Sequence, residues 1–173
     1  MQPLLGGPNR AIYEEKIRAI YGEDALPLRS ADDLRPLMIA KTGDSFDRYL
    51  DLVFLTKLIL IDRQTHREAA TDMAHTLYHD HTVGHVRLKF TLSRQTGISK
   101  EQIPGIESLT PEDVVLGLYD GFTDFQQEQP AFSFTLSPLF RKETDFYDTN
   151  RFASKEEDFS HQVNELLGLI ERY

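Results

Sequence analysis

The sequence predicts a mainly α-helical, bundle-like single domain over residues 1–173, with a small two-stranded β element. The chain has 173 residues, of which 40% are apolar and 27% charged, as is typical of one globular domain. Several segments repeat apolar residues at the helical period, and two short segments alternate apolar with polar residues. Residues 1–8 precede the first helix signal, so we expect them to form a disordered tail.

Charge and cysteine content narrow the classes of function. Lys and Arg total 19 and Asp and Glu total 28, so the formal net charge is −9. An acidic surface repels phosphates, which disfavours nucleic acid and anionic membranes as partners. Without Cys the chain forms no disulfide, iron–sulfur centre or zinc–thiolate site. The most apolar run, residues 50–61, is too short and too charged to span a membrane, so we expect a cytoplasmic protein.

Helix signals in the first half of the chain combine an apolar period with a start or stop signal. The segment over residues 46–61 is apolar on nearly all sides in its second half, so we expect it to be buried. The segments are residues 9–21 before Gly22, a short helix from Ser30 and Asp33 to Gly43 around Pro36, residues 46–61, and residues 66–79 after a Thr65–Glu68 capping box.

Helix signals in the second half are strongest near residue 110, where a cap, a proline and an acidic residue follow in the order that starts a helix. The segment that begins at Ser154 has the clearest amphipathic pattern in the chain. The starts are Ser99 with Gln102, which opens a short helix broken at Pro104, then Thr110 with Pro111 and Asp113, and finally Ser154 with Glu157.

Two stretches, residues 85–93 and 131–137, alternate apolar and polar side chains. This period of two is typical of β-strands, and an isolated strand cannot satisfy its backbone hydrogen bonds. We therefore expect the two to pair. A helix over residues 83–95 stays open as an alternative, because Val83, Val86 and Phe90 also share one helical face.

Histidines cluster between residues 66 and 85, which hold His66, His75, His79, His81 and His85. On the helix expected over residues 66–79, Glu68, Asp72, His75 and His79 fall on one stripe. Two histidines four residues apart can hold a divalent transition metal, with the carboxylates as further ligands. The apolar residues of this helix centre on the opposite side, so the stripe faces solvent unless a second element covers it.

A second carboxylate-x-x-histidine motif joins the first. Asp72-x-x-His75 and Asp158-x-x-His161 both lie on expected helices, and di-iron helical proteins use paired Glu-x-x-His motifs. Here Asp replaces Glu, and both motifs lie off the apolar helix faces. Asp158 and His161, together with His81 and His85, are therefore candidate metal ligands that rank after the stripe.

One segment resembles a DNA-binding motif. Leu92-Ser-Arg-Gln-Thr-Gly-Ile-Ser-Lys-Glu-Gln-Ile103, followed by Gly105-Ile-Glu107, is similar to the turn and recognition helix of repressor-type helix-turn-helix domains. The resemblance implies a transcriptional regulator. However, Pro104 breaks the recognition helix, and residues 101–125 contain no Lys or Arg for phosphate contacts.

The sequence contains no Gly-rich phosphate loop, no nucleophile elbow and no assignable catalytic triad. We therefore expect an interaction or regulatory protein, as a homodimer or with another protein partner, rather than an enzyme. A metal-binding helical protein or metal-dependent enzyme that uses the stripe around residues 68–85 is the alternative. A degenerate helix-turn-helix regulator is the lesser one.

Overall fold

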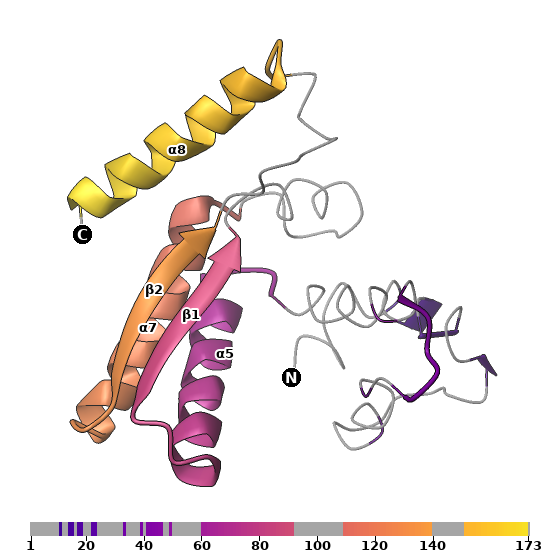
Figure 1. Ribbon diagram of the computed structural model, residues 1–173, viewed down its shortest axis with the longest axis vertical. Helices are drawn as coiled ribbons and strands as arrows, with labels where there is room; N and C mark the ends of the chain where they lie inside the picture. Colours follow the sequence, from indigo (N-terminus) through magenta and orange to yellow (C-terminus); the bar gives the residue numbers. More distant parts are fainter. Residues whose placement is uncertain are drawn as a thin grey trace. The chain divides into compact units, whose positions relative to one another are not determined.

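The computed structural model describes residues 60–91, 109–139 and 151–172, together with separate positions between Ala11 and Tyr49 (Figure 1). The chain divides into two compact units. The first comprises Met1–Ile61 and Lys100–Glu107, and the second comprises Asp62–Ser99 and Ser108–Tyr173. The single domain expected from the length stays a prediction, as does the disordered tail at residues 1–8, which lies outside the described residues.

In the first unit, Gly22 lies where the sequence predicts the end of the helix over residues 9–21, and it is not helical. Gly22 has a positive φ of 86°, and its N–H donates to the Arg18 carbonyl oxygen at 2.8 Å. Glycine adopts this left-handed conformation without steric cost, so it ends helices readily. The described helical positions before it are Ala11, Glu14, Glu15, Ile17 and Arg18. The other two helices expected in this unit, from Ser30 to Gly43 and over residues 46–61, lie largely outside the described residues.

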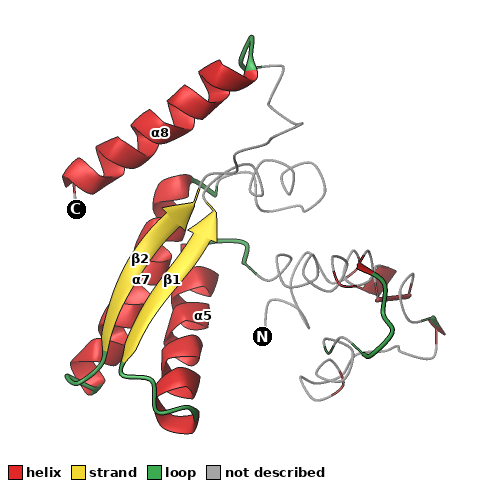
Figure 2. Cartoon of the chain, viewed as in Figure 1, coloured by secondary structure: helices red, strands yellow, loops and turns green. Residues whose placement is uncertain are grey.

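The second unit contains three α-helices, one π-helical segment and two strands in its described part (Figure 2). The prediction of a mainly α-helical protein with a two-stranded β element is confirmed. The elements are α5 (Arg63–His75), η3 (Thr76–Asp80), β1 (His85–Thr91), α7 (Pro111–Glu128), β2 (Ser133–Leu139) and α8 (Lys155–Arg172). None of these helices is long and apolar enough to cross a membrane.

The two expected strands pair with each other, and they run parallel, with His85 opposite Ser133 at one end and Thr91 opposite Leu139 at the other. Parallel neighbours need a crossover connection, and α7 lies within it. Both α5 and α7 lie on one side of the sheet (Figure 1). The side chains that form the core between these layers include Ala70, Ala74, Val86, Leu118, Phe122, Phe125 and Phe132.

The start of α5 corrects one prediction. The N-cap is Asp62 rather than Thr65, and the helix begins at Arg63. Asp62 accepts a hydrogen bond from the Thr65 N–H at 2.8 Å, and the Asp62 N–H donates to the Thr65 hydroxyl at 3.1 Å. Thr65 therefore occupies the N3 position of this capping box and not the N-cap position. The helix also stops being α-helical at His75, four residues before the expected end.

The starts of α7 and α8 are confirmed. Thr110 caps α7 by accepting from the Asp113 N–H at 3.1 Å, while the Asp113 carboxylate accepts from the Thr110 N–H at 2.9 Å. At α8 the Ser154 hydroxyl accepts from the Glu157 N–H at 3.2 Å. These contacts satisfy N–H groups that have no partner inside their helix.

Two glycines allow α5 and α7 to pack closely. A Cβ on Gly117 would lie 2.5 Å from the Arg63 carbonyl oxygen, and one on Gly121 would overlap the carbonyl oxygen of Arg67. Real Cβ atoms do not approach backbone this closely. The two glycines lie four residues apart and so share one face of α7, which must be free of side chains for α5 to fit against it.

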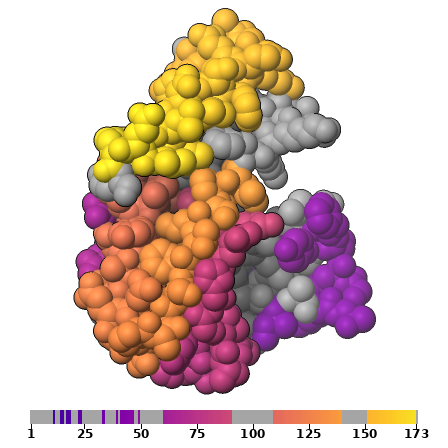
Figure 3. Space-filling view, turned by 60° about the vertical axis from the view of Figure 1, so that its left-hand side comes forward, coloured from indigo at the N-terminus to yellow at the C-terminus, as the bar shows by residue number. Residues whose placement is uncertain are grey.

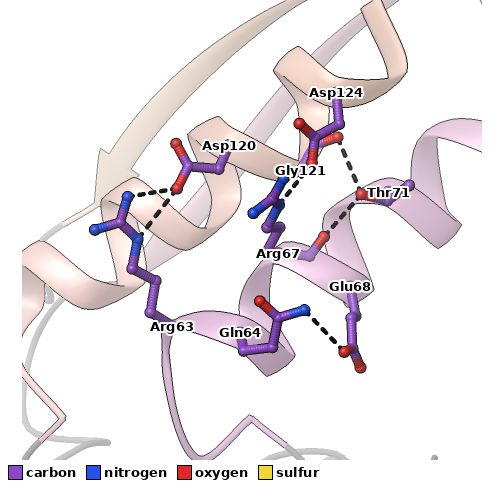
Figure 4. Close-up of polar contacts among 8 residues, drawn as sticks. All are labelled: Arg63, Gln64, Arg67, Glu68, Thr71, Asp120, Gly121 and Asp124. Atoms are coloured by element: carbon purple, nitrogen blue, oxygen red, sulfur yellow. Dashed lines mark hydrogen bonds and ion pairs between the residues drawn. The ribbon is translucent and has the colours of Figure 1, made fainter. Parts of the chain in front are cut away.

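Ion pairs flank this contact (Figure 4). The Arg63 guanidinium lies 2.5 Å from the Asp120 carboxylate, and that of Arg67 lies 2.6 Å from Asp124. Thr71 adds a hydrogen bond from its hydroxyl to the Gly121 carbonyl oxygen at 3.1 Å. Because the pairs advance in the same order along both helices, α5 and α7 run in the same direction.

The second unit therefore contains two helix–strand pairs with the same spacing. The N-cap of α7, Thr110, follows the N-cap of α5, Asp62, by 48 residues, and Ser133 follows its strand partner His85 by the same 48. Buried positions match as well, since Ala70 and Ala74 correspond at this spacing to Leu118 and Phe122. Few residue types are shared, which explains why no repeat is visible in the sequence.

Candidate functional site

The C-terminal end of α5 changes from α-helix to π-helix over Thr76–Asp80. Short π-helical segments are rare and are often found at functional sites. The chain then turns toward β1 through Thr82, whose φ of 55° is unusual for a β-branched residue. The Val83 N–H donates to the Leu77 carbonyl oxygen at 2.9 Å and closes this turn. The π-helix and the turn after it contain two of the candidate metal-ligating histidines, His79 and His81.

His75 and His79 contact each other and one phenylalanine of α7. Their ring centroids lie 5.7 Å apart, and the His75 ring meets Phe125 edge-on at 4.6 Å. His79 meets the same phenylalanine at 6.0 Å, and Tyr78 packs against Phe125 and Phe132. We call His75, Tyr78, His79, Phe125 and Phe132 the histidine–aromatic cluster. His75 is thus half-buried against α7 and only partly solvent-facing.

Among the described residues, α7 places a carboxylate beside this cluster. The Glu128 carboxylate lies 3.7 Å from His75 Nε2. Glu68, which the sequence pattern places on the same stripe, instead accepts a hydrogen bond from Gln64 at 3.0 Å. Glu128 was missed by sequence reasoning, because its approach to His75 depends on how α5 and α7 pack. The packing of α5 against α7 thus brings a carboxylate beside the two stacked imidazoles of the cluster.

The remaining candidate ligands occupy separate surroundings. His85 Nδ1 lies 2.9 Å from the Ser133 hydroxyl, the buried Asp158 accepts a hydrogen bond from Gln162, and His161 packs against Phe152. Asp72 and His81 are exposed. Within the described ranges, no three His, Asp or Glu side chains form a group that could hold a metal ion. The metal site at His75, His79, Asp72 and Glu68 stays a prediction.

His66 is the histidine that the fold buries most deeply among those described. Its side chain lies at the contact between α5 and α7 beside Gly117, and the residue is only 6% exposed. Its Nδ1 lies 2.7 Å from the Asp62 carbonyl oxygen. Burial lowers the pKa of His66, and the bond to Asp62 together with the charges of Asp62 and Asp113 opposes this only in part. In the sequence, His66 lies at the expected start of a helix, and no pattern there indicates that its side chain is buried.

We expect the buried His66 to make the protein less stable in mild acid. As the pH falls below about 6.5, the unfolded chain binds a proton at this residue before the folded chain does. The free energy of unfolding therefore decreases until the pH reaches the lowered pKa of the folded state. Urea unfolding at about pH 7.5 and about pH 5.5 measures this loss, and the His66→Gln variant should show a smaller one.

The matched control for this prediction is His161→Gln, because His161 is exposed. That variant should keep the pH dependence of the wild type. If His66→Gln and the wild type lose equal stability over the same pH range, the buried imidazole is not the cause.

The segment that resembles a helix-turn-helix, residues 92–107, lies outside the described residues. The helix that would follow it, α7, packs along α5 through Gly117 and Gly121. DNA binding through this segment stays a prediction. Comparison of the chain with protein-family models, with curated proteins and with solved structures finds no match.

Proposed function

We propose that this protein acts by binding other protein chains and that it forms a homodimer through α8. The observation that carries the proposal is a row of exposed apolar side chains on this helix. Phe159, Leu167 and Ile170 are 47%, 51% and 63% exposed. Together with the half-buried Val163 they recur every three or four residues, so they lie on one face of α8. We call these four residues the α8 stripe.

The α8 stripe adjoins the part of α8 that packs inward. Leu169 is buried, and Leu166 packs against the core formed by α5, α7 and the strands. Within the described part of the chain, the apolar face of α8 is therefore wider than the surface that packs on this core. Contiguous exposed apolar surface on one helix is typical of a protein–protein interface.

A second copy of the chain can cover the α8 stripe. In an antiparallel pair of α8 helices, Phe159 meets Ile170 of the second copy and Val163 meets its Leu167, so apolar side chains are matched along the whole contact. Such a two-fold contact uses the same surface on both chains, as most homodimers do. The first turn carries Glu156, Glu157 and Asp158, and a parallel pair would place two acidic turns together. Charge therefore favours the antiparallel arrangement.

The test is the mass of the protein in solution at micromolar concentrations, measured by sedimentation. We expect the wild type to be a dimer and the variant Leu167→Glu/Ile170→Glu to be a monomer. Burying two carboxylates against apolar side chains costs several kcal/mol, enough to dissociate a helix pair. Both substituted side chains are exposed, so the fold should be retained.

The matched control is His161→Glu/Asn164→Glu, which adds the same charge on the opposite, exposed side of α8. It should remain dimeric. A wild type that is monomeric at every concentration, or a dimer that both variants keep, would refute the α8 interface.

A further inference from the structure

The face of the sheet that points away from the helices is polar and carries positive charge. Val86, Leu88 and Phe90 of β1 pack toward the core. Successive side chains of a strand point to opposite faces, so the residues between them point outward. On β1 these are His85, Arg87 and Lys89, and all three are exposed. Their register partners on β2 are Ser133, Thr135 and Ser137.

Arg87 and Lys89 differ from three arginines of the helices in their ion pairing. Arg63 and Arg67 each lie against an aspartate of α7, and Arg172 of α8 lies 3.4 Å from Glu112. Within the described part of the chain, Arg87 and Lys89 have no carboxylate within ion-pair distance. The outward face of β1 is thus a row of unneutralised cations in a protein whose net charge is −9. Figure 3 shows β1 and β2 side by side at the surface.

One edge of β1 is available for pairing among the described elements. The described sheet has two strands, and β2 pairs with one edge of β1. An unpaired edge presents N–H and C=O groups that a further strand can bind. On the helix side of the sheet, Leu88 and Phe90 are only half-buried, which leaves apolar surface beside that edge.

We propose that the edge of β1 binds an extended segment of a partner protein in which acidic and apolar residues alternate. Directly opposite side chains of neighbouring strands lie about 5 Å apart, and the period of two is common to both strands. Carboxylates at every second position of the added strand therefore meet Arg87 and Lys89. The residues between them cover Leu88 and Phe90, and the backbone groups supply the hydrogen bonds.

The chemistry of the face favours a peptide over a nucleic acid. Proteins that bind single-stranded nucleic acid stack its bases on aromatic rings. From His85 to Lys89 and from Ser133 to Ser137, the outward positions hold no Phe, Tyr or Trp but one His, two basic residues and three hydroxyl side chains. The exposed residue that follows on β2, Leu139, is not aromatic either. The half-buried apolar surface on the other face also requires an occupant with apolar side chains.

The experiment measures binding of a fluorescent peptide in which Glu and Val alternate over seven residues, the length of β1. The wild-type full chain should bind it, and raising the salt from about 0.05 M to about 0.5 M should weaken binding. In Arg87→Glu/Lys89→Glu, two attractive pairs become repulsive, and we expect affinity to fall at least about tenfold. The variant Arg151→Glu/Lys155→Glu makes the same change in net charge outside β1 and β2 and should bind like the wild type.

A second peptide, with all Glu residues before all Val residues, tests the pattern without altering the protein. It should bind at least about tenfold more weakly. The variant Leu167→Glu/Ile170→Glu should bind the alternating peptide normally, because this site does not require the α8 dimer. Failure of the wild type to bind, equal binding of both peptides, or stronger binding of a single-stranded oligonucleotide of equal charge would overturn the proposal.

Discussion

Replacing Phe125 with alanine should lower the free energy of unfolding by about 3–5 kcal/mol, the usual cost of removing a buried ring. Phe125 is fully buried, and its ring contacts His75, Tyr78 and Phe132. A loss of this size is a large share of the stability of a typical domain. Urea unfolding followed by circular dichroism measures it.

Two further variants show whether the effect comes from the histidine–aromatic cluster. Phe125→Leu keeps most of the apolar contact and should cost less than Phe125→Ala. It also removes the aromatic ring beside His75, so the imidazole resonances of His75 should shift in NMR spectra. Phe46→Ala removes a ring that is 71% exposed and should change stability by no more than about 0.5 kcal/mol. A cost below about 1 kcal/mol for Phe125→Ala would contradict the described packing.

Replacing Gly121 with alanine should lower the free energy of unfolding by about 1–3 kcal/mol. The new Cβ would overlap the Arg67 carbonyl oxygen and lie 2.8 Å from the Ala70 Cβ. Because the obstacle is the backbone of another helix, α5 and α7 must separate. Separation weakens the Arg67–Asp124 ion pair and the bond from Thr71 to the Gly121 carbonyl oxygen. These losses should outweigh the gain of about 1 kcal/mol that alanine provides inside a helix.

The control is the same substitution at Gly168 of α8. A Cβ there would meet no atom within 4 Å. Gly168→Ala should therefore be neutral or stabilising by up to about 1 kcal/mol. A loss of stability at Gly121 but not at Gly168 would verify close packing between α5 and α7, whereas equal effects at the two glycines would exclude it.

The sequence by itself determined those features whose cause lies within a few residues. Thr110, Pro111 and Asp113 start α7 because the cap, the proline and the acid all act on the first turn of the same helix. The alternation of β1 and β2 likewise reflects the two faces of each strand. Even locally the sequence is ambiguous, since Thr65 matches a capping box either as the N-cap with Glu68 at N3 or as the N3 residue with Asp62 as the N-cap. The structure shows the second.

Only the tertiary structure decided which faces meet. The burial of His66, the approach of Glu128 to His75 and the need for glycine at positions 117 and 121 all arise from the contact of α5 with α7. Those helices are separated by β1 and by a further stretch of chain, so no local pattern encodes their register. The parallel direction of the strands and the 48-residue repeat of the two helix–strand pairs have the same origin. Long-range packing depends on the summed shape and burial of many side chains, whereas a helix cap or a strand period depends on a few neighbours.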